Sequence, residues 1–300
     1  MRYDVLGIGC TAVDELIYVP FYPPADGKVR VLRRERSFGG LTATALIAAA
    51  RLGARAAFAG RLGQDELSVA VRGDLEANGV DATEAVVTDD ARPGYATIII
   101  DETSGTRAVL SEILGVRGAD EARPGEEVIR SSLVLLVDGH GLAGSIRAAK
   151  VARDAGRPVV GDFEREHEGD FGALLALVDH LLVPSSFAER LTGDNDPARA
   201  AHRLADGRRA AVVTCGREGG WFCEPGAAPV HYAAFDVVAR DTTGCGDVFH
   251  GAYAAGLAFG WDAPTRIRWA AAAAALKAAG PGGRRAIPDR RSVEAFLAGA

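Results

Sequence analysis

Apolar runs of strand length alternate with amphipathic, alanine-rich helical segments along most of this chain. This alternation predicts a mostly parallel central sheet, because parallel neighbours need crossover helices, and those helices cover both faces of the sheet. The expected strands are 4–9, 54–59, 133–138, 158–162, 180–183 and 210–214. The expected helices are 41–52, 66–78, 144–155, 197–205, 246–259 and 263–279. The chain is therefore expected to have an α/β fold.

Two regions depart from this alternation. Residues 15–36 and 95–111 contain strand-like runs joined by turn residues, with no helix between them. Successive strands joined by short turns favour antiparallel pairing. The sequence predicts a small antiparallel sheet, set apart from the main one and formed by about 15–37 and 95–112. A sheet placed beside a ligand site would serve as a lid.

Composition narrows the classes of protein. The 300 residues are 48% hydrophobic with no low-complexity linker, so a single domain over 1–300 is expected. A net charge of −6 argues against nucleic acid as the partner. The cysteines at 10, 215, 223 and 245 form no metal-ligand spacing, which fits a reducing cytoplasm. The apolar stretch 269–276 is too short to span a membrane, so we expect a soluble protein.

The string Asp241-Thr-Thr-Gly-Cys-Gly-Asp247 opens a long helical segment of small residues. Amides in the first turn of a helix have no intrahelical partners, and the helix dipole favours an anion there. An acid beside such a site, Asp247, would suit a general base that takes a proton from an attacking hydroxyl. Ordinary helix capping is the alternative for a short DTTG, but the full string favours function.

A second glycine motif lies at the N-terminus. Residues 7–12 match GxGxxA, the turn of a dinucleotide-binding unit. That motif requires a helix directly afterwards, whereas this chain continues into an apolar run followed by prolines at 20, 23 and 24. The turn is therefore expected to deliver Asp14 to the ligand-binding edge of the sheet, where its alternative role is a turn cap.

The 241–247 string resembles the C-terminal signature of the ribokinase-like (PfkB) carbohydrate kinases. Phe38-Gly-Gly-Leu-Thr-Ala-Thr-Ala45, with the helix ending in Arg51-Leu-Gly53, resembles the N-terminal signature GGxxxNxA of that family, with Thr44 in place of the usual Asn. The resemblance implies a ribokinase-like fold and ATP-dependent phosphorylation of a sugar hydroxyl. Asp247 would be the base, and the amides of Gly244, Cys245 and Gly246 would form the anion hole.

The resemblance also implies substrate contacts at Asp14, Gly39, Gly40 and Thr44, and a β-lid often used for homodimerisation. Two further candidates come from position in the sequence. Lys28, between the halves of the predicted lid, would meet an anionic group of the sugar or lie in solvent. His140, after a strand, would face the sugar or pack in the core. The charged stretch at His167 is expected to be a surface loop.

On the nucleotide side, residues 212–219 resemble the strand and glycine turn that accommodate ATP, with Thr214, Gly216, Gly219 and Gly246 as contacts. A P-loop motif is absent from the sequence. Residues 184–187 replace the NxxE motif that the family links to Mg²⁺, and Asp162 and Glu164 are alternative acids for that ion. The family also binds a monovalent cation such as K⁺, at positions matching Asp241 and Thr243.

Residues 247–252, 274–277 and 281–289 together look like the branch that contains ketohexokinase and sulfofructose kinase. That branch favours a ketose, phosphorylated on a primary hydroxyl. The alternatives are a nucleoside kinase of the same fold and a non-catalytic sugar sensor, which the lost NxxE suggests.

Cys245 stands where alanine is common. A thiol at a helix N-terminus is expected to have a lowered pKa, so its oxidation or alkylation would block the phosphate site.

Overall fold

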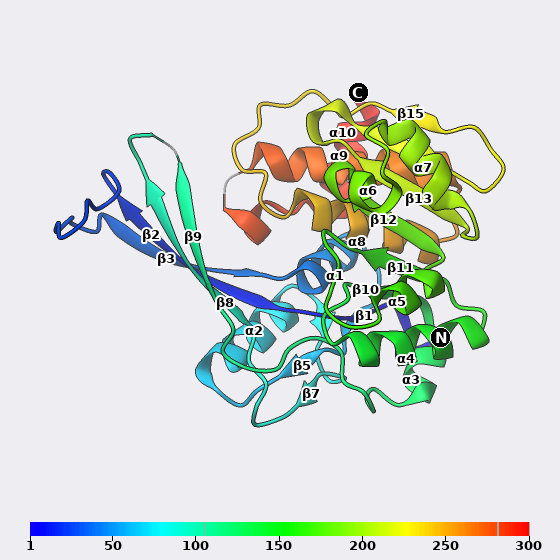
Figure 1. The fold of residues 1–300 in the computed structure, drawn as a ribbon, viewed down its shortest axis with the longest axis horizontal. Helices are drawn as coiled ribbons and strands as arrows, with labels where there is room; N and C mark the ends of the chain where they lie inside the picture. Colours follow the sequence, from blue (N-terminus) through cyan, green and yellow to red (C-terminus); the bar gives the residue numbers. More distant parts are fainter. Residues whose placement is uncertain (105, 281, 300) are drawn as a thin grey trace.

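A nine-stranded sheet, sheet A, runs through the centre of the protein (Figure 1). The structure is a computed structural model that describes residues 1–104, 106–280 and 282–299. In spatial order the strands are β15 (Val230–Tyr232), β14 (Gly220–Cys223), β13 (Ala210–Thr214), β12 (His180–Pro184), β11 (Val159–Asp162), β10 (Ser132–Val137), β1 (Tyr3–Ile8), β4 (Ala56–Phe58) and β6 (Val80–Asp81). All neighbours pair in parallel from β13 to β6, which confirms the predicted sheet.

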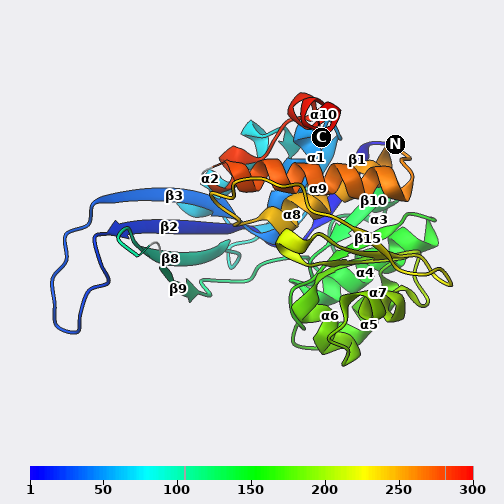
Figure 2. The same ribbon diagram turned by 90° about the horizontal axis from the view of Figure 1, so that it is seen from above.

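Helices cover both faces of sheet A, as Figure 2 shows. One face carries α1 (Leu41–Arg51), α2 (Glu66–Ala77), α8 (Cys245–Ala258), α9 (Ala263–Ala279) and α10 (Arg290–Ala298). The other carries α3 (Glu126–Arg130), α4 (Leu142–Asp154), α5 (Phe171–Leu177), α6 (Ser185–Thr192) and α7 (Pro197–Ala205). Each face buries its own apolar cluster. In β10, Val134 and Leu136 belong to one cluster and Leu135 and Val137 to the other. A strand buried on both faces is a continuous apolar run, which is why the central strands could be predicted.

A second sheet, sheet B, extends from the body as an arm (Figures 1 and 2). Its order is β3 (Arg33–Gly39), β2 (Ala12–Val19), β8 (Gly94–Asp101) and β9 (Arg107–Glu112). The two outer pairs are antiparallel as predicted, but the central pair β2 and β8 is parallel. Ala12 faces Gly94 where both strands leave the body, so the two strands run outward together.

The predicted helices and central strands agree with the observed ones to within about two residues at most ends. The short or edge elements α3, α5, α6, α10, β14 and β15 were not expected. A third, two-stranded sheet pairs β5 (Arg61–Leu62) with β7 (Val86–Val87). These elements are too short for a periodic pattern to stand out from neighbouring loops. Within the described residues, every helix is too short or too polar to cross a lipid bilayer.

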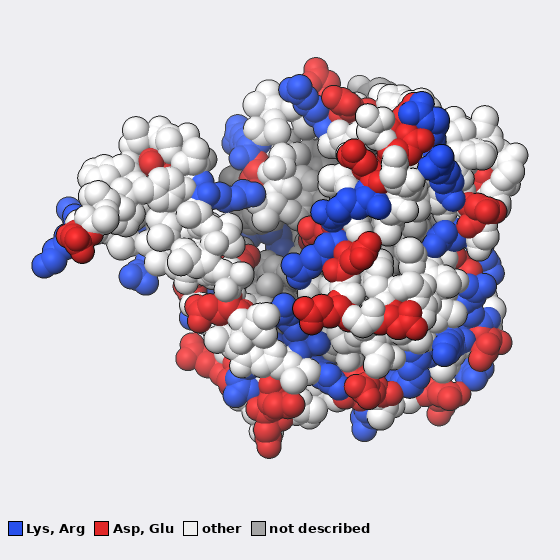
Figure 3. All heavy atoms as spheres, viewed as in Figure 1, with Lys and Arg blue, Asp and Glu red and all other residues white. Residues whose placement is uncertain are grey.

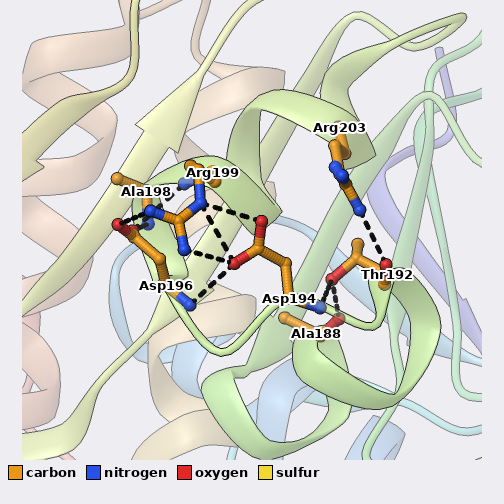
Figure 4. A network of polar contacts seen from close by, with 7 residues as sticks. All are labelled: Ala188, Thr192, Asp194, Asp196, Ala198, Arg199 and Arg203. Atoms are coloured by element: carbon orange, nitrogen blue, oxygen red, sulfur yellow. Dashed lines mark hydrogen bonds and ion pairs between the residues drawn. The ribbon is translucent and has the colours of Figure 1, made fainter.

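The α6–α7 turn is held by a polar network at the surface (Figure 4). Asp196 caps α7 by accepting from the amides of Ala198 and Arg199. The guanidinium of Arg199 bridges Asp194 at 2.8 Å and Asp196 at 2.8 Å. The hydrogen bonds from Arg199 lower the pKa of Asp194 to about 2. This network fixes a turn on the far side of sheet A from α8 and α9.

Candidate active site

Two adjoining cavities open at the carboxyl ends of the parallel strands, where open α/β sheets bind ligands. The larger has a volume of about 770 Å³ and extends toward sheet B. The smaller, of about 600 Å³, lies between the end of β13, α8 and α9. Pro184, Thr214 and Gly246 line both cavities, so the two meet at the start of α8. Figure 3 shows the surface hollowed where the arm joins the body, with charged side chains around the hollow.

The segment 241–246, here called the anion loop, contains the turn before α8 and the first two residues of that helix. Gly244 precedes the helix with a φ of +76°, a left-handed conformation that glycine adopts without strain. The amide of Cys245 donates to the carbonyl of Thr242 at 3.2 Å. Among the described residues, the amides of Gly244 and Gly246 have no such partner. A Cβ built on Gly246 would meet nothing within 4 Å, so an anion has room to approach these amides.

Asp247, in the first turn of α8, lies in a cluster of titratable groups. Its carboxylate, that of Asp162 and a ring nitrogen of His250 all lie within 4.8 Å of one another. Burial, followed by the negative charges of Asp162 and Glu164, raises the pKa of Asp247 well above its ordinary value. A carboxyl group with a raised pKa is a stronger proton acceptor when ionised, as a general base requires.

Asp162 and His250 form a buried pair behind Asp247. His250 Nδ1 lies 2.7 Å from Asp162 Oδ1, but the angles are poor for a hydrogen bond, and both carboxylate oxygens of Asp162 lack a hydrogen-bond partner among the described residues. Glu164 lines the same cavity, and burial raises its pKa. Unpartnered buried carboxylate oxygens are costly unless a ligand or ion satisfies them.

Asp14, Gly39, Gly40 and Thr44 converge on the larger cavity. Asp14 lies on β2 opposite Ser37 of β3, and burial raises the pKa of its carboxyl group. Gly40 has a φ of +97°, and a Cβ there would lie 2.6 Å from the Thr11 Cα atom, so only glycine fits. This conformation starts α1 beside Asp14. The four residues form one wall of the cavity.

Asp138, which directly follows β10, supports the cavity wall from beneath the start of α1. Its fully buried carboxylate accepts from the amide of Cys10 at 2.7 Å and from the hydroxyl of Thr42 at 2.9 Å. It also accepts from the amide of His140 at 2.9 Å. Burial alone would raise the pKa of Asp138, but the His140 ring and the amides of Cys10 and His140 lower it. His140 thereby lines the cavity, with the ring of His167 packed edge-on against it at 4.7 Å.

Arg284 lies in the turn η2 (Gly283–Ala286) and closes the larger cavity. Its buried guanidinium donates to Thr44 Oγ1 at 3.1 Å, to Asp74 Oδ2 at 2.6 Å and to the carbonyl of Gly39. Its positive charge lowers the pKa of both Asp14 and Asp247, against the larger effect of burial. The positive charge of the guanidinium therefore acts on both Asp14 and Asp247.

The smaller cavity has a different chemistry. Thr214, Gly216 and Gly219 line it at the end of β13. Apolar and aromatic side chains form most of the remaining wall: Tyr232, Phe235, Val237, Phe249, Ala271, Ala274 and Ala275. The rings of Tyr232 and Phe249 stack at 5.8 Å. Such a wall accommodates a flat ring, while Gly246 leads onward to the anion loop.

The model that describes pfkB family carbohydrate kinases matches residues 8–290. The chain belongs to the pfkB family of carbohydrate kinases. It is 27% identical to the ribokinase of Haemophilus influenzae over 99% of each chain. It is 30% identical to an ATP-dependent ribose-1-phosphate kinase of Halopiger xanaduensis, over 98% of this chain and 97% of the relative.

Among solved structures, the ribokinase of Arabidopsis thaliana complexed with ribose and ATP superposes with a TM-score of 0.88. The two chains are 23% identical over 99% of each, which shows a shared fold. The ribokinase-like fold predicted from the sequence is thus confirmed. This pfkB kinase is a phosphotransferase that acts on an alcohol group of a sugar.

Most residues predicted for the site of this pfkB kinase do line the two cavities, but Lys28 and Asp241 do not. Lys28 is exposed in the loop between β2 and β3, at the outer tip of the arm in Figure 1. Lys28 does lie between the two lid strands in the sequence, but it is far from the cavity. The long strands β2 and β3 carry their connecting loop away from the body.

The expected low pKa of the Cys245 thiol was wrong. Burial, with a contribution from Asp241 and Asp247, raises the pKa of Cys245, and the charge of Lys277 does not reverse this. Since the thiolate is the reactive form, modification of Cys245 is expected to be slow.

Arg284, Asp138, His167 and His250 belong to the cavity wall or its support, but the sequence alone did not assign them a role there. His167 was expected in a surface loop, yet burial lowers its pKa to about 4 and it lines the cavity. The sequence did contain a signal for Asp138 and His250. Asp138 is an acid at the carboxyl end of a buried strand, where such folds bind ligands. His250 lies one helical turn after the expected base Asp247, and so on the same face of the helix. The sequence contained no signal for Arg284, since its contacts are with residues more than 200 positions away.

Proposed function

We propose that this protein is an ATP-dependent sugar kinase in which Asp247 is the general base. The observation that carries the proposal is that Gly246 lines both cavities and directly precedes Asp247. A sugar hydroxyl in the larger cavity would lie beside the carboxylate. A nucleotide in the smaller cavity would extend its phosphates over the anion loop. The Arabidopsis thaliana ribokinase complexed with ribose and ATP supports this assignment by its fold.

The reaction is an in-line displacement. The sugar oxygen forms a bond to the γ-phosphorus as the bond from that phosphorus to the ADP oxygen breaks, and the hydroxyl proton passes to Asp247. The amides of Gly244 and Gly246 donate to the transferring phosphoryl group, and the amide of Cys245 joins them if it leaves Thr242. Fixed donors at this point stabilise charge in the transition state.

Asp162 and Glu164 fit a Mg²⁺ ion that travels with ATP. Their carboxylates line the cavity next to Asp247, and hard oxygen ligands are those that Mg²⁺ prefers. Asp162 Oδ1 faces His250 Nδ1, but Oδ2 lacks a hydrogen-bond partner among the described residues, and this oxygen supports the choice over a purely structural role. Mg²⁺ held here, directly or through water, would offset the charge of the phosphates.

We further propose a ketose with a reactive primary hydroxyl as the sugar, following the resemblance of residues 247–252, 274–277 and 281–289. Asp14, the amides at Gly39 and Gly40, Thr44 and His140 would bind its other hydroxyls. A nucleoside kinase and a non-catalytic sensor are the competing functions. The cluster of acids around Asp247 favours a catalytic function over the sensor, because groups with raised pKa values gather at catalytic sites.

Sheet B is proposed as the lid of the larger cavity and as the surface of a homodimer. Arg107 of β9 reaches the anion loop, with Nη1 3.5 Å from the hydroxyl of Thr243. Val109, Leu110 and Ile113 are more than half exposed on or beside the same strand. An apolar strand at a sheet edge invites a partner copy.

Four cysteines that form no disulfide in the structure fit a reducing, cytoplasmic compartment.

The test is an ATP-consumption screen over ketoses, aldoses, sulfofructose and nucleosides, with the Asp247→Asn variant as the matched control. Turnover of a ketose by the wild type, lost in the variant, supports the proposal. Preference for a nucleoside favours the first competing function. Binding of sugars without turnover of any alcohol favours the sensor and overturns the proposal.

A further inference from the structure

Lys277, in the last turn of α9, is a lysine buried inside the protein. Its side chain is only 1% exposed, and a buried ammonium needs oxygen partners to replace its hydration. Its Nζ donates to the backbone carbonyl of Asp241 at 2.8 Å and lies 3.5 Å from the carboxylate Oδ2 of the same residue. Both contacts are therefore made to the residue that opens the anion loop.

The same end of α9 anchors the loop by its backbone. The carbonyl of Ala278 accepts from the amides of Arg240 at 2.7 Å and Asp241 at 3.1 Å. Asp241 Oδ2 also accepts from the amide of Gly283 at 2.9 Å. Asp241 is thus fixed by α9 and by the turn that carries Arg284. The start of the anion loop cannot move without breaking these bonds.

Lys277 also lines the larger cavity, together with Thr243, Gly244 and Gly246. Its positive charge therefore lies next to the anion loop, on the side where a phosphate would bind. An ammonium has three N–H donors, and two are accounted for by the Asp241 oxygens. A fixed cation in a partly dry site stabilises negative charge on a transferring group more than a hydrated one does.

The resemblance implies a K⁺ ion held by Asp241 and Thr243, and these residues do not fit it well. Carbonyl and carboxylate oxygens are suitable ligands for K⁺. In this protein, however, both the carbonyl and the Oδ2 oxygen of Asp241 face the ammonium of Lys277. A tethered cation is present at all times, whereas a free ion must bind from solution.

We propose that the Lys277 ammonium is a built-in monovalent cation of the anion loop, so that phosphoryl transfer by this chain needs no added K⁺. Lys277 fixes the conformation of the loop by its contacts with Asp241. Its positive charge lies next to the loop that would receive the phosphate. It is a positioning residue. The inference rests on the proposed function, because the loop must receive a phosphate.

The experiment compares the wild type with Lys277→Ala and Lys277→Met, and uses Lys150→Met as the control. Lys150 is an exposed lysine of α4 outside both cavities. Turnover and the Tm shift produced by a non-hydrolysable ATP analogue are measured in chloride salts of K⁺, NH₄⁺ and tetramethylammonium at one ionic strength. Tetramethylammonium is too large to enter the space left by the lysine.

The wild type and Lys150→Met are expected to behave alike in all three salts. In tetramethylammonium, Lys277→Ala should lose on the order of 10²-fold in turnover and most of the analogue's Tm shift. K⁺ or NH₄⁺ should restore both in Lys277→Ala, because alanine leaves room for an ion. Lys277→Met should not be restored, since its thioether chain fills that space.

A wild type that requires K⁺ for turnover or for the analogue's Tm shift overturns the inference. So does Lys277→Ala if it is as active as the wild type in tetramethylammonium, or if K⁺ and NH₄⁺ restore neither quantity. If no sugar is turned over, the proposed function fails, while the Tm shift of the analogue still tests Lys277. Should both Lys277 variants fail to fold, the wild type in the three salts decides.

Discussion

The two cavities meet at Gly246 but differ in their chemistry. The larger is lined by the acids Asp14, Asp162, Glu164 and Asp247, with Arg284 facing them. The smaller has the aromatic rings of Tyr232, Phe235 and Phe249 and the alanines of α9 in its wall. Polar groups with fixed directions distinguish one hydroxyl from another. Flat apolar walls bind a ring mainly by its shape. Substitutions in the first cavity should therefore affect catalysis and sugar binding, and those in the second should affect nucleotide binding alone.

The largest expected effect is that of Asp247→Asn. An amide cannot accept the hydroxyl proton, so kcat should fall at least about 10²–10³-fold. The KM for the sugar should change little, since the amide keeps the size of the carboxylate. Steady-state kinetics with the sugar found in the screen measure both. A kcat within a few-fold of the wild type would remove Asp247 from the role of base.

Arg284→Met tests whether the buried guanidinium of the larger cavity is structural, substrate-binding or both. Removal of the guanidinium leaves the carboxylate of Asp74 without its buried partner, and we expect a loss of about 3 kcal/mol in the free energy of unfolding. The KM for the sugar should rise because Thr44 and Gly39 lose their anchor. Urea unfolding and kinetics check the two parts. Asp74→Asn is the control, expected to reduce stability with less change in sugar KM.

Ala274→Leu tests the apolar cavity. Ala274 lies on α9 in its wall, and leucine is a good helix former, so the helix should tolerate the change. The larger side chain takes space from the nucleotide, and the KM for ATP should rise on the order of 10-fold. The KM for the sugar should stay as in the wild type. Equal increases in both values would mean that the two cavities do not act separately.

The raised pKa of Asp247 predicts two dependences on pH. Activity should fall as pH drops through the raised pKa, because the base becomes protonated. The folded protein holds this proton more tightly than the unfolded chain, so this group makes folding less favourable as pH rises from 3.8 through the raised pKa. Asp247→Asn should accordingly have a higher Tm than the wild type at neutral pH. Below 3.8 the difference should vanish, and a Tm gap that is constant with pH would contradict the assignment.

Arg199→Ala, in the surface network of Figure 4, should have the smallest effect of the set. Its side chain is 63% exposed, and exposed ion pairs are screened by water and salt. We expect a slight fall in Tm and unchanged kinetics. A loss of stability as large as that of Arg284→Met would show that burial is not what separates the two arginines.

Much of the fold followed from the sequence because its signals are local. A strand buried on both faces is an apolar run, and a helix on such a sheet shows an alanine-rich stripe, so β10, β13, α1 and α8 were predicted nearly residue for residue. Edge strands such as β15 and one-sided helices such as α10 carry shorter and weaker patterns. The parallel pairing of β2 with β8 joins segments about eighty residues apart, which no local pattern records.

The sequence by itself determined the α/β class, the anion loop and Asp247, because a glycine-rich string before a helix shapes its own backbone and exposes its own amides. Only the tertiary structure decided which charges surround that loop. Arg284 and Lys277 reach the site from a late turn and the end of α9, and Asp162 and His250 meet across two elements. Long-range Coulomb interactions and burial depend on distance in space, and distance in space is set by the packing of the whole chain.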